Sequence, residues 1–129
     1  MIPNEKIDAI CLTLGQNFLH KVYPGGEKRV RHYLERMNNG DQFQWMQFCG
    51  SGIPTIKVQY CYVIWGGKVQ YRCDIREFIK GCTGEFADGG VTRSFENRNL
   101  CVLQGPTITA PYDIPMKGFQ GFRYSPFLF

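Results

Sequence analysis

The sequence predicts an α+β domain, in which N-terminal helices pack on a small, mostly antiparallel β-sheet or barrel. Apolar residues recur at spacings of three and four before Asn38-Asn39-Gly40-Asp41, and they alternate with polar residues after this turn. Two helical segments followed by about five strands are typical of the α+β class. A chain of 129 residues also predicts one domain over 1–129 that can bury a core.

The first 23 residues predict a helix that Asn4 caps and that Pro24-Gly25-Gly26 ends. One face of this helix would carry the apolar side chains of Ile7, Ile10, Cys11, Leu14, Phe18 and Val22. A second helix is predicted over 27–37, with an apolar side and a basic remainder. Its apolar side would consist of Val30, Tyr33, Leu34 and Met37.

Strands are predicted from residue 43 onward. Over 43–48, Phe43, Trp45 and Gln47 would share one face, because side chains alternate along a strand. The stretch TIKVQYCYVIW and the stretch KVQYRCDI flank Gly66-Gly67, which predicts a hairpin with a two-residue loop. A regular ladder from this loop pairs Tyr60 with Cys73 and Tyr62 with Tyr71. Cys61 and Cys73 would then point to opposite faces, which excludes a disulfide between them.

The C-terminal half contains more turn-forming residues. Residues 80–99 are rich in glycine and polar residues, and we expect a long loop or irregular excursion there. Short strands are predicted over 99–104 and 107–112. The tail, 119–129, is expected to close the sheet as an extended segment, with its phenylalanines docked on apolar surface. These are Phe119, Phe122, Phe127 and Phe129.

Composition limits the functional classes. Fifteen basic and eleven acidic residues give a net charge of +4, which permits an anionic partner without requiring one. The six cysteines include no CxxC pair, the N-terminus lacks the pattern of a signal peptide, and no segment reaches the ~18 apolar residues of a membrane span. We therefore expect a cytoplasmic protein with reduced cysteines and no membrane contact.

Metal and nucleophile signals are weak. His20 and His32 are the only histidines, and neither forms a short-spaced ligand pair with a cysteine. No cysteine stands in a recognisable catalytic neighbourhood. We therefore predict no metal and no cofactor.

The strongest chemical pattern is the proximity of cationic and aromatic residues. Such mixtures suit nucleic-acid backbones and splayed bases, through charge and through stacking. For any single residue, the alternative is a solvated helix face or ordinary core packing. The predicted ligand-binding set is Lys28, Arg29, Arg31, Trp45, Tyr71, Arg72 and Arg123.

From residue 24 onward the layout resembles the PUA-like superfamily of small β-barrels, which includes ASCH and EVE domains. Gly26-Glu27-Lys28 supplies a G-x-K with arginines nearby, Gly40-Asp41 supplies a turn, and YCYVIWGGKVQYRCDI supplies the hairpin. The tail GFQGFRY also resembles the closing segment of phage-type proteins of this layout. The resemblance implies a PUA-like pseudo-barrel over 24–129, which would follow the predicted helix over 1–23, and a cleft for a base or nucleotide.

Some ASCH-like members are amidohydrolases or ribonucleases with a Lys, Thr and Glu site. Lys28 matches the lysine of that site, but Arg29 and Val30 stand where the threonine is expected. Glu77 and Glu85 are the candidates for the glutamate. This departure weakens the enzymatic interpretation.

The first hypothesis is therefore a non-catalytic binding module for RNA, DNA or a nucleotide, including a modified base. The second is a small ASCH-like amidohydrolase or ribonuclease that acts on a nucleoside or RNA through Lys28. The third is a phage protein-interaction module that blocks a host factor, and such a protein would act in the host cytoplasm.

Overall fold

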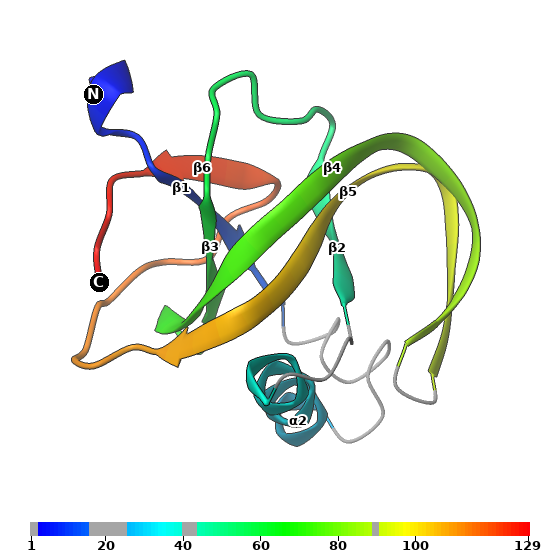
Figure 1. The fold of residues 1–129 in the computed structure, drawn as a ribbon, viewed down its shortest axis with the longest axis horizontal. Helices are drawn as coiled ribbons and strands as arrows, with labels where there is room; N and C mark the ends of the chain where they lie inside the picture. The colour runs from blue at the N-terminus through cyan, green and yellow to red at the C-terminus, as the bar shows by residue number, and fades with distance from the viewer. Residues whose placement is uncertain (1–2, 16–25, 40–43, 89–90) are drawn as a thin grey trace.

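The computed structural model describes residues 3–15, 26–39, 44–88 and 91–129 of the chain (Figure 1). Within these residues it contains one 3-10 turn, one α-helix and six strands. In chain order they are η1 (Asn4–Lys6), β1 (Ala9–Thr13), α2 (Glu27–Asn38), β2 (Trp45–Gly50), β3 (Tyr60–Trp65), β4 (Lys68–Asp88), β5 (Val91–Thr109) and β6 (Phe122–Ser125).

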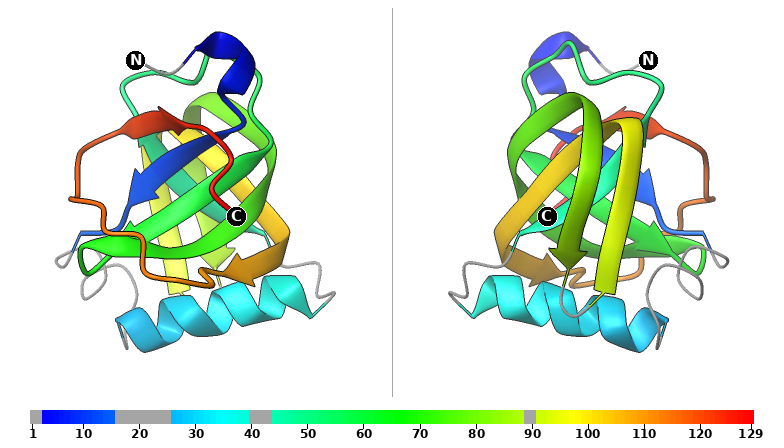
Figure 2. Two further views of the ribbon diagram at one scale, coloured as in Figure 1. Left: turned by 90° about the vertical axis from the view of Figure 1, so that its left-hand side faces the viewer. Right: turned by 90° about the vertical axis from the view of Figure 1, so that its right-hand side faces the viewer.

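The six strands form one sheet in the order β2-β5-β4-β3-β1-β6 (Figure 1). β1 and β3 run parallel, and every other pair of neighbours is antiparallel. The sheet curls into a half-barrel, and α2 lies across one end of it (Figure 2). An α+β fold with a mostly antiparallel, barrel-like sheet is thereby confirmed.

The predicted N-terminal helix is wrong where the structure describes it. Residues 4–6 form only η1, and Ala9–Thr13 is a strand between β3 and β6. Four of the five β1 residues are buried, so both faces of this strand are covered. A strand buried on both faces gives a continuous apolar run, which the spacing of apolar residues does not distinguish from a helix. The part of the prediction over 16–22, with His20, lies outside the described residues.

The helix predicted over 27–37 is confirmed as α2, with Val30, Tyr33, Leu34 and Met37 buried. Its last turn is fixed to β5 by two hydrogen bonds. Thr107 donates its hydroxyl to the Leu34 carbonyl oxygen at 3.0 Å and its backbone N–H to Asn38 Oδ1 at 3.2 Å. Gly105 passes directly beneath this turn, and a Cβ atom there would lie 2.8 Å from the Met37 carbonyl carbon.

The β3–β4 hairpin forms around Gly66-Gly67, but its predicted register is wrong beyond the first two pairs. Trp65 pairs with Lys68 and Ile64 with Val69, as a regular ladder requires, and a bulge then shifts the register by one residue. Cys61 therefore lies directly opposite Cys73. A one-residue bulge moves every later side chain to the other face of its strand, which alternation alone does not reveal.

The irregular excursion predicted over 80–99 is also wrong. These residues form the outer halves of β4 and β5, which pair as far as Asp88 and Val91 (Figure 1). Register shifts after Ile79 and after Cys82 interrupt the ladder. The strands predicted over 99–104 and 107–112 are consecutive parts of β5, which ends at Thr109.

We name the outer halves of this hairpin, 80–88 and 91–98, the arm. Figure 2 shows that the arm bends sharply back toward the end of the barrel that α2 covers. Arg93 donates a hydrogen bond to the Met46 carbonyl oxygen on β2. The Phe95 ring, 5% exposed, packs edge-on against Phe48 with the centroids 5.7 Å apart. The arm is therefore packed on β2 rather than projecting into solvent.

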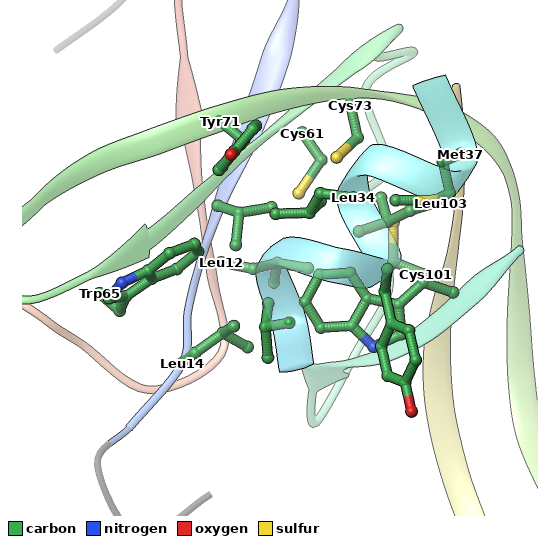
Figure 3. Packing of buried hydrophobic residues seen from close by; sticks show 14 of the residues in the cluster. Leu12, Leu14, Leu34, Met37, Cys61, Trp65, Tyr71, Cys73, Cys101 and Leu103 are labelled. Carbon is green, nitrogen blue, oxygen red and sulfur yellow. The ribbon is translucent and has the colours of Figure 1, made fainter. Parts of the chain in front are cut away.

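The main core lies between α2 and the concave side of the sheet (Figure 3). Five of the six cysteines are buried in the molecule, and only Cys82 is partly exposed. Cys61, Cys73 and Cys101 have no exposed surface. None of the six forms a disulfide, so these thiols serve as small apolar core groups.

This burial predicts selective thiol chemistry. At about pH 8, Cys82 should react with a thiol reagent such as DTNB, and the five buried thiols should react only as the protein opens, because burial keeps a thiol inaccessible to the reagent. The native protein should therefore show one fast thiol, and the denatured protein all six. Cys82→Ser should remove the fast phase. Fast reaction of several native thiols would contradict this packing.

The two edges of the sheet meet at one corner. Gly50 at the end of β2 and Gly121 before β6 both have positive φ values, 102° and 72°, and a Cβ atom on Gly50 would lie 2.9 Å from the Gly121 Cα. Nearby, Tyr124 on β6 accepts a hydrogen bond from the Thr55 backbone N–H at 3.0 Å. These contacts draw the sheet toward closure where only glycine leaves room.

The tail docks largely as expected. Phe122 and Tyr124 pack against the main core, and Phe119 and Phe129 pack against a second cluster around Tyr62. Phe127 departs from the prediction, because it is 54% exposed and lies beside Tyr60. The tail is therefore a closing strand with one outward-facing ring.

Candidate functional site

The predicted binding residues do not gather in one cleft. Trp45 has no exposed surface and packs in the main core, away from solvent. Tyr71 is 7% exposed and stacks on Trp65, with the ring centroids 6.1 Å apart. Both rings belong to the core (Figure 3), and the tryptophan next to the hairpin loop, rather than Trp45, is the partner of Tyr71.

Arg31 is the predicted cation that does lie with aromatic rings. Its guanidinium carbon is 5.1 Å from the Trp65 ring centroid and 5.8 Å from the Tyr71 centroid. Its Nη2 atom forms an ion pair with Glu27 at 2.8 Å and donates to Gln70 Oε1 at 3.3 Å. The Trp65 indole and the Arg31 guanidinium face the Glu27 carboxylate and lower its pKa. Most of the hydrogen-bonding capacity of Arg31 is thus used within the protein.

A cavity of about 340 Å³ lies beside Arg31, between β4 and the segment that follows β5. Lys68 and Asp113 line it, and they pair with each other at 3.5 Å. Because each cation at this cavity has an acidic neighbour, the cavity offers little net attraction to an anion.

The remaining predicted cations are dispersed. Lys28 is exposed on the first turn of α2, and Arg29 lies over the Tyr33 ring at 5.8 Å. Arg72 is covered by the protein's own tail: it lies 4.7 Å from the Tyr60 centroid and donates to the carbonyl oxygen of Phe129. A cation therefore does lie beside aromatic rings here, as predicted, but Arg72 makes these contacts with the protein's own residues.

Arg123 is exposed on β6, with its guanidinium carbon 4.4 Å above the Phe119 ring. As predicted from alternation, it points away from the core that Phe122 contacts. No cavity described in the structure includes it, so it stands alone as a candidate contact.

Another group of cations lies where the arm bends away from the sheet. A cavity of about 520 Å³ opens there, and we name it the bend pocket. Its lining comes from the end of β2 and from both strands at the bend. The lining residues are Phe48, Gly50, Ser51, Lys80, Gly81, Asn97, Arg98 and Asn99.

The bend itself comes from backbone conformations that interrupt the ladder. Gly81 and Asn97 have positive φ values of 63° and 50°, and they lie beside the register shifts of β4. Glycine and asparagine are the residues that adopt this conformation most readily. A side chain at Gly81 would meet Asn97 Oδ1 at 3.0 Å, so this pair of positions is closely fitted.

Asn99 holds the floor of the bend pocket in place. Its Oδ1 atom accepts a hydrogen bond from the Gly81 backbone N–H at 3.0 Å, and its Nδ2 donates to the Gly50 carbonyl oxygen at 3.2 Å. One side-chain amide thus joins β4, β5 and β2. Because both ends of the amide are engaged, Asn99 positions the pocket walls rather than offering free polar groups to a ligand.

The charged residues of the bend pocket are both cationic. Arg98 lies over the Phe48 ring, with its guanidinium carbon 5.0 Å from the centroid, and Lys80 is exposed on the opposite strand. Among the described residues that line the pocket, none is acidic. Two cations, a hydroxyl and an asparagine amide around a cavity are the chemistry of an anion-binding site.

Sequence reasoning missed this site because it assigned 80–99 to an irregular loop. Lys80 and Arg98 are eighteen positions apart, and only the pairing of β4 with β5 brings them together. A usable signal was present: Gly81 and Gly84 on one side and Glu96-Asn97 on the other fit a bulged hairpin as well as a loop.

Across the part of the chain that the structure describes, no three His, Cys, Asp or Glu side chains are grouped to hold a metal ion. No described helix combines the length and hydrophobicity that crossing a membrane requires.

Comparisons with protein-family models, with curated proteins and with solved structures find no match to this chain. The resemblance to the PUA-like superfamily therefore stays a prediction.

Proposed function

We propose that this protein binds nucleic acid or a nucleotide, without catalysis, through the bend pocket. One observation carries the proposal: Lys80 and Arg98 face a cavity of about 520 Å³ with no acidic residue in its described lining. Uncompensated cations around a concave surface attract phosphate. The aromatic ring of Phe48 in the same wall favours a ligand that also carries a planar group.

The bend pocket supports this function better than the cavity beside Arg31. At the latter, Glu27 and Asp113 neutralise the two cations. A phosphate that enters there would have to displace an existing ion pair. At the bend pocket the cations are available as they stand, so binding requires no such exchange.

The hydrolase hypothesis gains no geometric support. Lys28 is exposed to solvent, whereas an enzyme that uses a lysine as nucleophile lowers its pKa by burial or by a neighbouring charge. Glu77 pairs with Arg76 at 3.6 Å on β4, and Glu85 accepts a hydrogen bond from Ser94 at 3.4 Å on the arm.

The test is fluorescence anisotropy with a labelled single-stranded RNA and DNA of the same sequence, over a range of salt concentrations. Lys80→Ala with Arg98→Ala should weaken binding at least about tenfold and reduce the salt slope by about 1.4, since each phosphate contact on a single strand contributes about 0.7. Thermal unfolding should show that this double variant remains folded, because the two substituted side chains are exposed.

The matched control is Lys6→Ala with Lys117→Ala, which removes two exposed positive charges that do not line the bend pocket. This variant should retain both the affinity and most of the salt slope. Equal losses in the two double variants would mean that binding follows net charge alone. Absence of binding by the wild-type protein to either strand and to mononucleotides would refute the proposed function.

A further inference from the structure

We infer that the bend pocket takes a single unpaired nucleotide, with the base stacked on the Arg98 guanidinium and the phosphate beside Lys80. The inference rests on the proposed function and assigns the parts of the ligand to the two walls of the same site.

The size and shape of the pocket favour one nucleotide. A volume of about 520 Å³ lies within the range of about 300–1,000 Å³ that is usual for small-molecule sites. The pocket is concave, between the end of β2 and the two strands of the bend. A paired base is stacked within its duplex and cannot present its face to such a cavity, so the nucleotide must be unpaired or flipped out.

The base is assigned to Arg98 because this guanidinium ends a series of packed planar groups. Phe86 packs on Phe95 with the centroids 5.8 Å apart, Phe95 packs edge-on against Phe48, and Phe48 supports Arg98. Phe95 is buried and Phe48 is half-buried, whereas Arg98 is exposed. The next planar group in this series would belong to the ligand, and bases stack readily on guanidinium planes.

The phosphate is assigned to Lys80. Its side chain is carried by β4 and lines the bend pocket together with Phe48 and Arg98, and an ammonium binds phosphate as a point charge. The Ser51 hydroxyl, at the end of β2, lines the same cavity and can donate to a phosphate oxygen. Asn99 holds these walls at a fixed separation through its bonds to Gly50 and Gly81.

Each decisive variant changes one property of a side chain in the bend pocket, either its charge or its shape, and keeps the other property. Arg98→Lys retains the positive charge and removes the planar surface. Lys80→Gln removes the charge and retains most of the side-chain length. Calorimetric titrations with AMP and with ribose 5-phosphate, a probe that has the phosphate but no base, then separate the two contributions.

For the wild-type protein we expect AMP to bind at least about tenfold more tightly than ribose 5-phosphate, since stacking of one base typically contributes that much or more. Arg98→Lys should lose this preference and bind ribose 5-phosphate as the wild type does. Lys80→Gln should weaken both probes together. A single-stranded oligonucleotide should also bind more tightly than the blunt duplex of the same sequence.

Two results of the titrations would overturn the inference while leaving the proposed function intact: equal binding of AMP and ribose 5-phosphate by the wild type, or undiminished AMP binding by Arg98→Lys. Binding of the duplex as tightly as the single strand would likewise refute an unpaired ligand. Failure of the wild type to bind any of these probes would instead refute the proposed function, so the two failures are distinguishable.

Discussion

Gly105→Ala should destabilise the protein by about 3 kcal/mol or more, since forcing extra atoms into a packed site costs about 1–3 kcal/mol and more when backbone is displaced. An alanine Cβ would overlap the carbonyl group of Met37 in the last turn of α2. The Met37 carbonyl is backbone and the alanine Cβ is fixed directly to the backbone, so neither group can rotate away. The helix end would have to lift off β5, which breaks the two hydrogen bonds from Thr107 and opens the packing of Leu34.

The measurement is thermal unfolding by circular dichroism, where this loss corresponds to a fall in Tm of about 10 °C for a domain of this size. Gly52→Ala is the matched control, because a Cβ atom there meets nothing within 4 Å. Thr107→Val should cost about 1 kcal/mol, the typical value of one hydrogen bond. If Gly105→Ala melts within about 2 °C of Gly52→Ala, α2 does not dock on β5 in this way.

The second large effect is a loss of stability at alkaline pH. Burial raises the pKa of Cys11 to about 11 and that of Cys49 to about 12, and it raises the pKa of Cys61 and Cys73 well above the ordinary value. An unfolded thiol ionises at about pH 8.5. Above that pH the unfolded chain releases protons that the folded protein retains, so rising pH favours unfolding.

Each such thiol removes about 1.4 kcal/mol per pH unit once the pH exceeds about 8.5. For the four thiols together, the loss between about pH 8 and pH 10 is about 8 kcal/mol, comparable with the whole stability of a typical domain. The stabilising effect of the buried thiols is fully present below about pH 8.5 and declines as the pH rises toward the folded-state values. Urea unfolding with a reductant, repeated over this pH range, measures the slope.

Cys73→Ala tests the cause, because it removes one ionisable core group at a fixed site. The variant will be less stable than the wild type at neutral pH, since it leaves a small cavity. Its loss between about pH 8 and pH 10 should nevertheless be smaller by about 2 kcal/mol. An unchanged slope would show that the alkaline sensitivity has another origin.

The sequence predicted those elements whose two faces differ in polarity. The α2 helix and the alternation along β2 follow from such a contrast, and Trp45, Gln47 and Cys49 are buried as alternation requires. β1 has no such contrast, because both of its faces are buried: Ile10 and Leu12 pack in the main core, and Ala9 and Cys11 pack in the second cluster. A single sequence does not distinguish a strand of this kind from a short helix.

The chemistry of the candidate site, cations beside aromatic rings, could be predicted from the sequence, but its location in the fold could not. Cations do lie on rings, as in the pairs of Arg31 with Trp65 and of Arg98 with Phe48. Which of these pairs lines a cavity depends on the bulges in β4, since one shifted residue decides whether Lys80 and Arg98 line the same cavity. Neighbours along the chain, such as Lys28, Arg29 and Arg31, were therefore a poor guide to neighbours in space.

The interrupted ladder of the arm also bears on the risk of pairing between the exposed strand edges of two molecules. In the arm, β4 no longer pairs with β3 and β5 no longer pairs with β2, so each strand has only one neighbour in the sheet. Exposed strand edges can recruit further chains into aggregates. The irregular backbone at Gly81, Gly84 and Asn97 breaks these edges into short, twisted pieces that offer no continuous template. The same bends that shape the bend pocket thus protect the longest hairpin of the molecule from edge-to-edge aggregation.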